Sequence, residues 1–242
     1  MLAYRGDFLL NASIRLAQDV LLPLVTVIVY AAGLSFPGWN FYEALLIQAV
    51  FMMCVGVSQT SFFGLTGTVM WMVREGTFDL VLIKPRSVML TSVSMSFNVS
   101  NINTFIAGAA FFAFSLAHMP APSLINIVTF MLLFAAGVSA LLGCCLFMAA
   151  TAFKWVGNGR IFEIFDSVTA FGRYPVTIYP KWLRTTALYA IPVAVTGFVP
   201  AAALLGKTEA GHYFAVLTCA AFLAAGMAVY RLAVRNYSSA GG

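Results

Sequence analysis

The stretch Arg74–Ser87, REGTFDLVLIKPRS, separates two long apolar runs and carries three basic and two acidic side chains. Most of the remaining sequence is apolar, since 62% of the 242 residues are hydrophobic and 9% are charged, with a mean hydropathy of +0.94. A charge at the centre of a membrane costs roughly 2.5–3.5 kcal/mol on insertion scales. The stretch is therefore predicted to be a solvent-side connection between two membrane spans, where a membrane protein can meet a soluble partner.

The apolar runs on either side predict an all-α integral membrane protein, with one transmembrane domain over residues 1–242. They are long and lack the alternation of a barrel strand, and helices satisfy their backbone hydrogen bonds internally. We expect six transmembrane helices. The approximate limits of the spans that the pattern locates directly are Val20–Leu34, Ala44–Val73, Thr91–Leu116, Ser123–Phe153 and, as the last span, His212–Val234.

Residues 1–19 are predicted to form an amphipathic helix in the membrane interface. Asp7, Asn11 and Arg15 share one helical face, and Leu9 and Leu16 lie on the other. A simple polar leader to the first span is the alternative. The charged residues ahead of the first apolar run do not follow the pattern of a cleavable signal, so we expect this span to be retained.

Small residues recur at intervals of four in the second and fourth spans, and we interpret them as helix-packing stripes. The two stripes are Gly56, Thr60, Gly64 and Thr68 in the second span and Ala135, Ser139 and Gly143 in the fourth. The third span has a polar first half, TSVSMSFNVSNINT, which places Asn98 and Asn101 on one face.

The segment between Lys154 and Gly206 admits two arrangements. In the first, 156–180 is an interfacial helix and 183–205 is a kinked fifth span. In the second, 158–178 is the fifth span, and 181–205, broken by Pro192 and Pro200, is a re-entrant hairpin on the far side of the membrane.

Basic residues test the orientation, because cytoplasmic loops are enriched in Lys and Arg. With both termini cytoplasmic, the first arrangement places twelve basic residues inside and only Lys207 outside. The second moves Arg173, Lys181 and Arg184 outward, which leaves nine inside and four outside. Both obey the rule, so we expect cytoplasmic termini and a cytoplasmic stretch at 74–87 in a bacterial-type plasma (inner) membrane.

No catalytic pattern is recognisable, and the chain is not expected to be an enzyme. Gly206-Lys207-Thr208 resembles the end of a phosphate-binding P-loop, but the glycine required five residues earlier is Ala201. The two histidines and the four cysteines lack metal-ligand spacing, and the cysteines are interpreted as small buried hydrophobic residues. Any active transport must therefore draw its energy from elsewhere.

Three local features resemble the small six-span membrane subunits of type-2 ABC (ABC-2) transporters. The first is the charged stretch, similar to the family's loop of a basic residue, an acidic-Gly pair, Asp-Leu, Leu and Pro. The others are Tyr174-Pro175 with Ile178-Tyr179, and Ile191-Pro192 followed by Pro200. With the interfacial N-terminal helix, the six spans and the proline-rich segment before the last span, the resemblance covers most of the chain. It favours the re-entrant arrangement of 181–205.

The resemblance implies that the stretch 74–87 is a coupling loop that docks on a separate cytosolic ABC ATPase. ATP and Mg²⁺ would be bound by that partner, and this chain would bind no cofactor, metal or nucleic acid. A charged loop that only orients the protein is the alternative. The residues assigned to coupling are Glu75, Gly76, Phe78, Asp79, Leu80, Leu82, Lys84, Pro85 and Arg86. We expect Gly76 to allow the chain to turn, and Phe78, Leu80 and Leu82 to be the apolar anchors of docking.

The function predicted from this resemblance is an exporter permease, in which two copies, or this chain and a related one, form the substrate path in the lipid bilayer. The polar residues assigned to the path, or to contacts between helices, are Asn98, Asn101, Glu163, Asp166 and Arg173. Two alternatives stay open: an ion- or proton-coupled secondary transporter, and a membrane assembly subunit without transport activity. The sequence does not identify the substrate.

Overall fold

The computed structural model describes residues 21, 23–155 and 159–238, and over these ranges the regular structure is helical. The interfacial helix expected at residues 1–19 lies outside the described residues. Of the expected first span, residues 23–31 form a helix that ends in a turn containing Gly33, whose φ is +76°.

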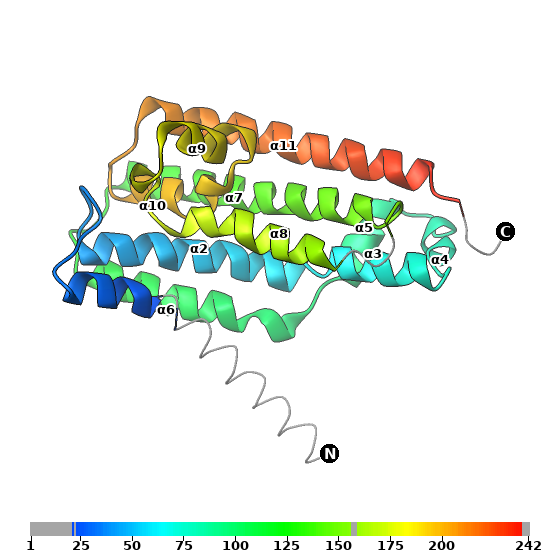
Figure 1. The fold of residues 1–242 in the computed structure, drawn as a ribbon, viewed down its shortest axis with the longest axis horizontal. Coiled ribbons are helices and arrows are strands. Elements are labelled where there is room, and N and C mark those ends of the chain that lie inside the picture. Colours follow the sequence, from blue (N-terminus) through cyan, green and yellow to red (C-terminus); the bar gives the residue numbers. More distant parts are fainter. Residues whose placement is uncertain (1–20, 22, 156–158, 239–242) are drawn as a thin grey trace, which may run out of the picture.

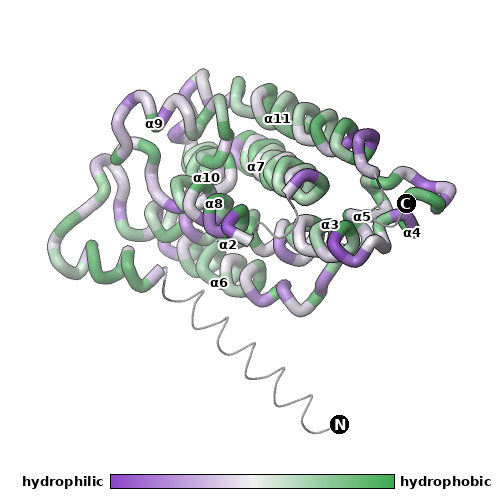
Figure 2. The backbone as a smooth tube through the Cα atoms, turned by 45° about the vertical axis from the view of Figure 1, so that its right-hand side comes forward, coloured by the Kyte–Doolittle hydropathy of each residue, from purple (hydrophilic) through white to green (hydrophobic). Residues whose placement is uncertain are grey.

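Among the residues that the structure describes, four segments are long and apolar enough to cross a membrane: Phe41–Arg74, Val99–Ala117, Leu124–Thr151 and Ala210–Arg235. They contain α2 (Phe41–Ser61) with α3 (Leu65–Arg74), η1 (Val99–Asn101) with α6 (Asn103–Ala117), α7 (Leu124–Thr151), and α11 (Ala210–Arg235). They run side by side along the long axis (Figure 1). In Figure 2 hydrophobic residues predominate along α6, α7 and α11, and hydrophilic stretches gather in the connections at the two ends. The second, third, fourth and last predicted spans thus correspond to long apolar helices.

The helices pack in pairs, α2 against α6 and α7 against α11, through close approaches at glycine. A Cβ atom on Gly56 would lie 2.6 Å from the Cα atom of Phe105 in α6. A Cβ atom on Gly226 of α11 would lie 2.8 Å from the carbonyl oxygen of Gly143 in α7. The interpretation of both stripes as packing surfaces is confirmed at Gly56 and Gly143.

The second and third spans are each interrupted, whereas we expected continuous helices over Ala44–Val73 and Thr91–Leu116. The former breaks between α2 and α3, and the latter is divided into α5 (Val88–Met95), η1 and α6. The two breaks face each other, because the Asn98 amide donates to the Thr60 carbonyl oxygen over 2.8 Å. The Asn98 side chain also accepts a bond from the Ser100 amide, which favours a local turn over a continuous helix.

The segment from 159 to 206 contains short helices. They are α8 (Arg160–Thr169), η2 (Ala170–Arg173), η3 (Val176–Ile178), α9 (Lys181–Thr185), η4 (Thr186–Ala190), η5 (Val193–Thr196) and α10 (Phe198–Leu204). All seven residues of α10 are buried, and α10 packs between α2 and α7. The proline-broken segment therefore ends inside the helix bundle, at the end opposite α4 (Asp79–Leu82) in Figure 1.

Candidate functional site

The charged stretch begins where α3 ends, and its first turn is set by Gly76. The backbone of Gly76 has a φ of +66°, a left-handed conformation that glycine adopts without steric cost. Two amides beyond it, those of Thr77 and Phe78, donate to the Met72 carbonyl oxygen over 2.9 and 3.2 Å. This closure satisfies the end of α3 and directs the chain into α4, a single helical turn, as expected for Gly76.

The inner face of α4 attaches it to the ends of two long helices. Phe78 and Val81 are fully buried. The Phe78 ring centroid lies 4.9 Å from that of Phe153, beyond α7, and 5.4 Å from that of Tyr237, beyond α11. The expectation that Phe78 is an anchor for a partner was therefore wrong, because its ring already packs inside this chain.

The outer face of α4 and the residues after it present apolar and charged side chains together. Leu80 is 57% exposed and Ile83 is 78% exposed. Ile83 was not among the residues assigned to coupling from the sequence, although it lies between two residues that were. We call the exposed set the coupling surface, and it consists of Glu75, Leu80, Leu82, Ile83, Lys84, Pro85 and Arg86. Asp79, the first residue of α4, is partly buried at its edge.

The two asparagines assigned to the path have structural partners at the helix breaks. Asn98 caps the η1 turn through the Ser100 amide. The Asn101 side-chain amide donates to the Gln59 carbonyl oxygen over 3.1 Å and so ties the beginning of the α6 segment to α2. These contacts favour the interpretation of both asparagines as inter-helix polar residues.

The three charged residues assigned around α8 form no ion pair with one another. Glu163 and Asp166 are exposed on α8, whereas Arg173 lies with its guanidinium 5.2 Å from the ring centroid of Phe51 in α2. In the part of the chain that the structure describes, the ion pairs are Arg184–Glu209 and Lys207–Glu43. Asp166 and Arg173 therefore form no direct ion pair.

The comparison with protein families decides the wider assignment. Residues 17–241 match the model of a family described as ABC-2 family transporter protein. The chain belongs to this family. This match confirms the resemblance seen in the charged stretch and the proline motifs. The chain is a multi-pass membrane protein of the permease type. Comparisons with curated proteins and with solved structures give no match.

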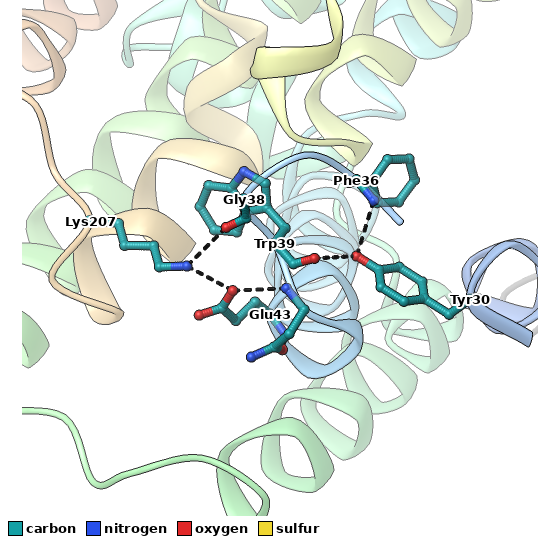
Figure 3. Close-up of polar contacts among 7 residues, drawn as sticks. Tyr30, Phe36, Gly38, Trp39, Glu43 and Lys207 are labelled. Atoms are coloured by element: carbon teal, nitrogen blue, oxygen red, sulfur yellow. Dashed lines mark hydrogen bonds and ion pairs between the residues drawn. The ribbon is translucent and has the colours of Figure 1, made fainter. Parts of the chain in front are cut away.

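The end of the ABC-2 chain opposite α4 has a second polar cluster, centred on Lys207 (Figure 3). The Lys207 ammonium donates to the Glu43 carboxylate over 2.7 Å and to the Gly38 carbonyl oxygen over 3.2 Å. It also lies 4.7 Å from the ring centroid of Trp39, within the range of a cation–π contact. The lysine of the P-loop-like sequence thus ties the residues after α10 to the beginning of α2.

Two further contacts extend this cluster. Glu43 and Asn40 form a capping box, in which the Asn40 amide donates to the Glu43 carboxylate and the Glu43 amide donates to the Asn40 side chain. The Tyr30 hydroxyl donates to the Trp39 carbonyl oxygen over 2.7 Å. The cluster therefore joins the helical segment at 23–31, the turn that follows it, α2 and the residues after α10.

Proposed function

We propose that this chain is the membrane-spanning subunit of an ATP-driven exporter, in which two permease chains form the path and cytosolic ABC ATPases supply the energy. Family membership supports a permease that works with an ABC ATPase. The proposal adds that the ATPase docks on the coupling surface, that transport is outward and that the permeases act as a pair.

The observation that carries the proposal is the two-sided construction of α4. Its outer side exposes Leu80 and Ile83, flanked by charges, a combination that suits a docking surface. Its inner side is held by buried Phe78 and Val81. Because the Phe78 ring contacts Phe153 and Tyr237, a force on α4 would be transmitted to the ends of α7 and α11 as well as to α3 and α5.

The breaks in the second and third spans determine which helices would move when a force acts on α4. The helix α5 contacts both α3 and α4, and the breaks separate α3 from α2 and α5 from α6. Helix breaks at matching positions are where two packed spans bend with the least disturbance of their hydrogen bonds. We infer that α3, α4 and α5 tilt as a unit when the ATPases close, with the breaks near Thr60 and Asn98 as the hinge.

The contacts of the proline-broken segment support the second six-span arrangement. Arg184 pairs with Glu209 at 2.9 Å, and Lys207 pairs with Glu43 at 2.7 Å. Groups in such contact lie on the same side of a membrane, whereas the first arrangement separates Arg184 from Lys207. We therefore propose that 158–178 is the fifth span, that 181–205 is re-entrant from outside, and that the α4 end is cytoplasmic.

The path itself is proposed to run beside α8 between the two permease chains. Glu163 and Asp166 are exposed and without an ion-pair partner in the described parts of this chain. Exposed carboxylates on a span are stable where they meet water or another polar chain rather than lipid. An interface between two copies that lines an aqueous path would provide such surroundings.

The docking proposal is tested by placing charge on the apolar part of the coupling surface. We expect Leu80→Asp/Ile83→Asp to reduce the amount of ABC ATPase that copurifies with the tagged chain from its own host by at least about tenfold. The reason is that truncating or charging central interface anchors commonly costs about 2 kcal/mol or more. The measurement is quantitative mass spectrometry of the purified complex.

The matched control is Leu124→Asp, which charges a leucine that is 79% exposed at the beginning of α7, toward the other end of the bundle. This control should retain the ATPase and give the same size-exclusion profile as the unmodified chain. Equal retention of the ATPase by Leu80→Asp/Ile83→Asp and by the control would contradict docking at α4.

A further inference from the structure

A cavity opens between the final turns of α7 and α11, apart from the coupling surface and the outer polar cluster. Its volume is about 540 Å³, within the range of small-ligand sites. The apolar part of its wall comes from Phe147, Phe153, Val229 and Leu232. Thr151, Lys154 and Asn236 contribute the polar part. The cavity thus has an apolar interior, and its polar groups lie at or just beyond the C-terminal ends of the two helices.

The polar part of the wall carries a positive charge that no acidic residue of the described ranges pairs with. Lys154 is exposed, and neither of the ion pairs formed by the described residues involves it. The helices α7 and α11 contain no acidic residue, whereas Arg231 and Arg235 add two exposed cations on the last two turns of α11. An occupant of this cavity is therefore favoured if it brings a negative charge.

The neighbouring tryptophan places this end of the cavity at the membrane–water boundary. Trp155 is 56% exposed, and the Lys154 ammonium lies 5.3 Å from its ring centroid. Tryptophan and lysine beyond the end of an apolar span are typical of the headgroup level, where the ring and the charge both find suitable surroundings. The molecules present there at high concentration are phospholipids.

We propose that this cavity binds one anionic phospholipid, with an acyl chain against Phe147 and Leu232 and its phosphate beside Lys154 and Asn236. Basic pockets between transmembrane helices recognise acidic headgroups in this manner, and lysine is a common phosphate ligand. Lipid binding goes beyond the proposed docking and transport steps, although Phe153 of the cavity wall also contacts Phe78 beside α4. A second copy of the chain in the same groove is the competing occupant.

The test uses Trp155 as its own reporter, in a chain whose other tryptophans, Trp39, Trp71 and Trp182, are replaced by Phe. The protein is reconstituted in phosphatidylcholine vesicles that contain increasing fractions of brominated phosphatidylglycerol or, separately, brominated phosphatidylcholine. We expect the brominated phosphatidylglycerol to quench Trp155 at a mole fraction about fivefold lower, because one lysine near an anionic headgroup contributes about 1 kcal/mol. Lys154→Gln should remove most of this preference while brominated phosphatidylcholine still quenches Trp155.

A matched control exists in the same chain, because Lys181 and Trp182 repeat the Lys-Trp pair outside this cavity. A chain that retains only Trp182 should be quenched by the two brominated lipids with less than a twofold difference. Equal quenching of Trp155 by both lipids would mean a non-selective lipid shell and would overturn the proposal. Protection of Trp155 from both lipids would also overturn it and would favour a second protein chain in the groove.

Discussion

At the scale of single residues, Lys207 shows how a motif can mislead. Its sequence, Gly-Lys-Thr, resembles a P-loop, but the ammonium group contacts a carboxylate, a carbonyl oxygen and a tryptophan ring at the end of the bundle opposite α4. A P-loop lysine follows a strand and opens a helix. Lys207 instead follows α10 and comes before α11, so its role is to join elements.

The two ion pairs at this end provide a prediction because they differ in burial. The side chain of Glu43 is 13% exposed, and that of Glu209 is 67% exposed. We expect a coupling energy of about 0.5–1 kcal/mol for Lys207 with Glu43, and a smaller value for Arg184 with Glu209, because solvent screens exposed pairs. The measurement is a double-mutant cycle in reversible detergent unfolding, with Lys207→Met and Glu43→Gln compared with Arg184→Met and Glu209→Gln.

The choice of Glu43→Gln keeps the helix cap, since glutamine also serves at the third position of a capping box. The cycle therefore measures the ion pair and not the loss of the cap at Asn40. Equal coupling energies for the two pairs would contradict the explanation by burial.

Phe78 shows the limit of sequence reasoning at this scale. An aromatic residue in a charged loop fits a docking anchor and an internal anchor equally well, and the choice depends on partners that come from distant parts of the chain. Those partners, Phe153 and Tyr237, lie 75 and 159 residues further along the sequence, and their rings lie within 5.4 Å of the Phe78 ring. Gly76 was predictable because its role depends on the local turn alone.

At the scale of elements, the close approach of α7 and α11 at Gly143 and Gly226 gives the next prediction. Gly226→Ala places a Cβ atom 2.8 Å from the Gly143 carbonyl oxygen, so the two backbones must separate. We expect a loss of about 1–3 kcal/mol of stability, the usual cost of overpacking. Gly67→Ala in α3 is the control, since nothing lies within 4 Å of its new methyl group.

The control should be neutral or should stabilise the chain by up to about 1 kcal/mol, because alanine has a higher helix propensity than glycine. The two variants make the same chemical change within a helix, so their difference isolates packing from propensity. Unfolding in mixed detergent micelles measures both. Equal effects of the two variants would refute the assignment of Gly226 to a helix contact.

The long apolar helices could be predicted because hydropathy and length are properties of one element, and α7 and α11 agree with Ser123–Phe153 and His212–Val234 to within a few residues. The breaks in the second and third spans could not be predicted, because each depends on the other. The Asn98 amide in one break donates a hydrogen bond to the Thr60 carbonyl oxygen beside the other. The polar sequence around Asn98 signalled an irregularity without showing its position.

At the scale of the whole molecule, basic residues divide between the two ends. Arg74, Lys84, Arg86, Lys154, Arg160, Arg231 and Arg235 lie at or beyond the ends of helices on the α4 side. Lys181, Arg184 and Lys207 lie toward the opposite end, where Arg184 and Lys207 are each paired with a carboxylate, and Arg173 lies against Phe51 of α2. This excess is the pattern expected when the α4 end is cytoplasmic.

The orientation and the re-entrant segment are tested together by labelling. In a chain whose four native cysteines are replaced by alanine, Thr185→Cys should react with a membrane-impermeant maleimide added to right-side-out vesicles. Ser87→Cys should react only after the membrane is permeabilised. Both positions are exposed, so accessibility within the chain does not explain a difference.

The result expected at position 185 follows from its neighbour. Arg184 pairs with Glu209, just before α11, and Lys207, two residues before Glu209, pairs with Glu43 at the beginning of α2. Position 185 therefore shares a membrane side with the beginnings of α2 and α11. Labelling of Thr185→Cys only after permeabilisation, with Ser87→Cys behaving in the same way, would instead place 183–205 as a full span. It would also require Arg184 to leave Glu209 in the membrane.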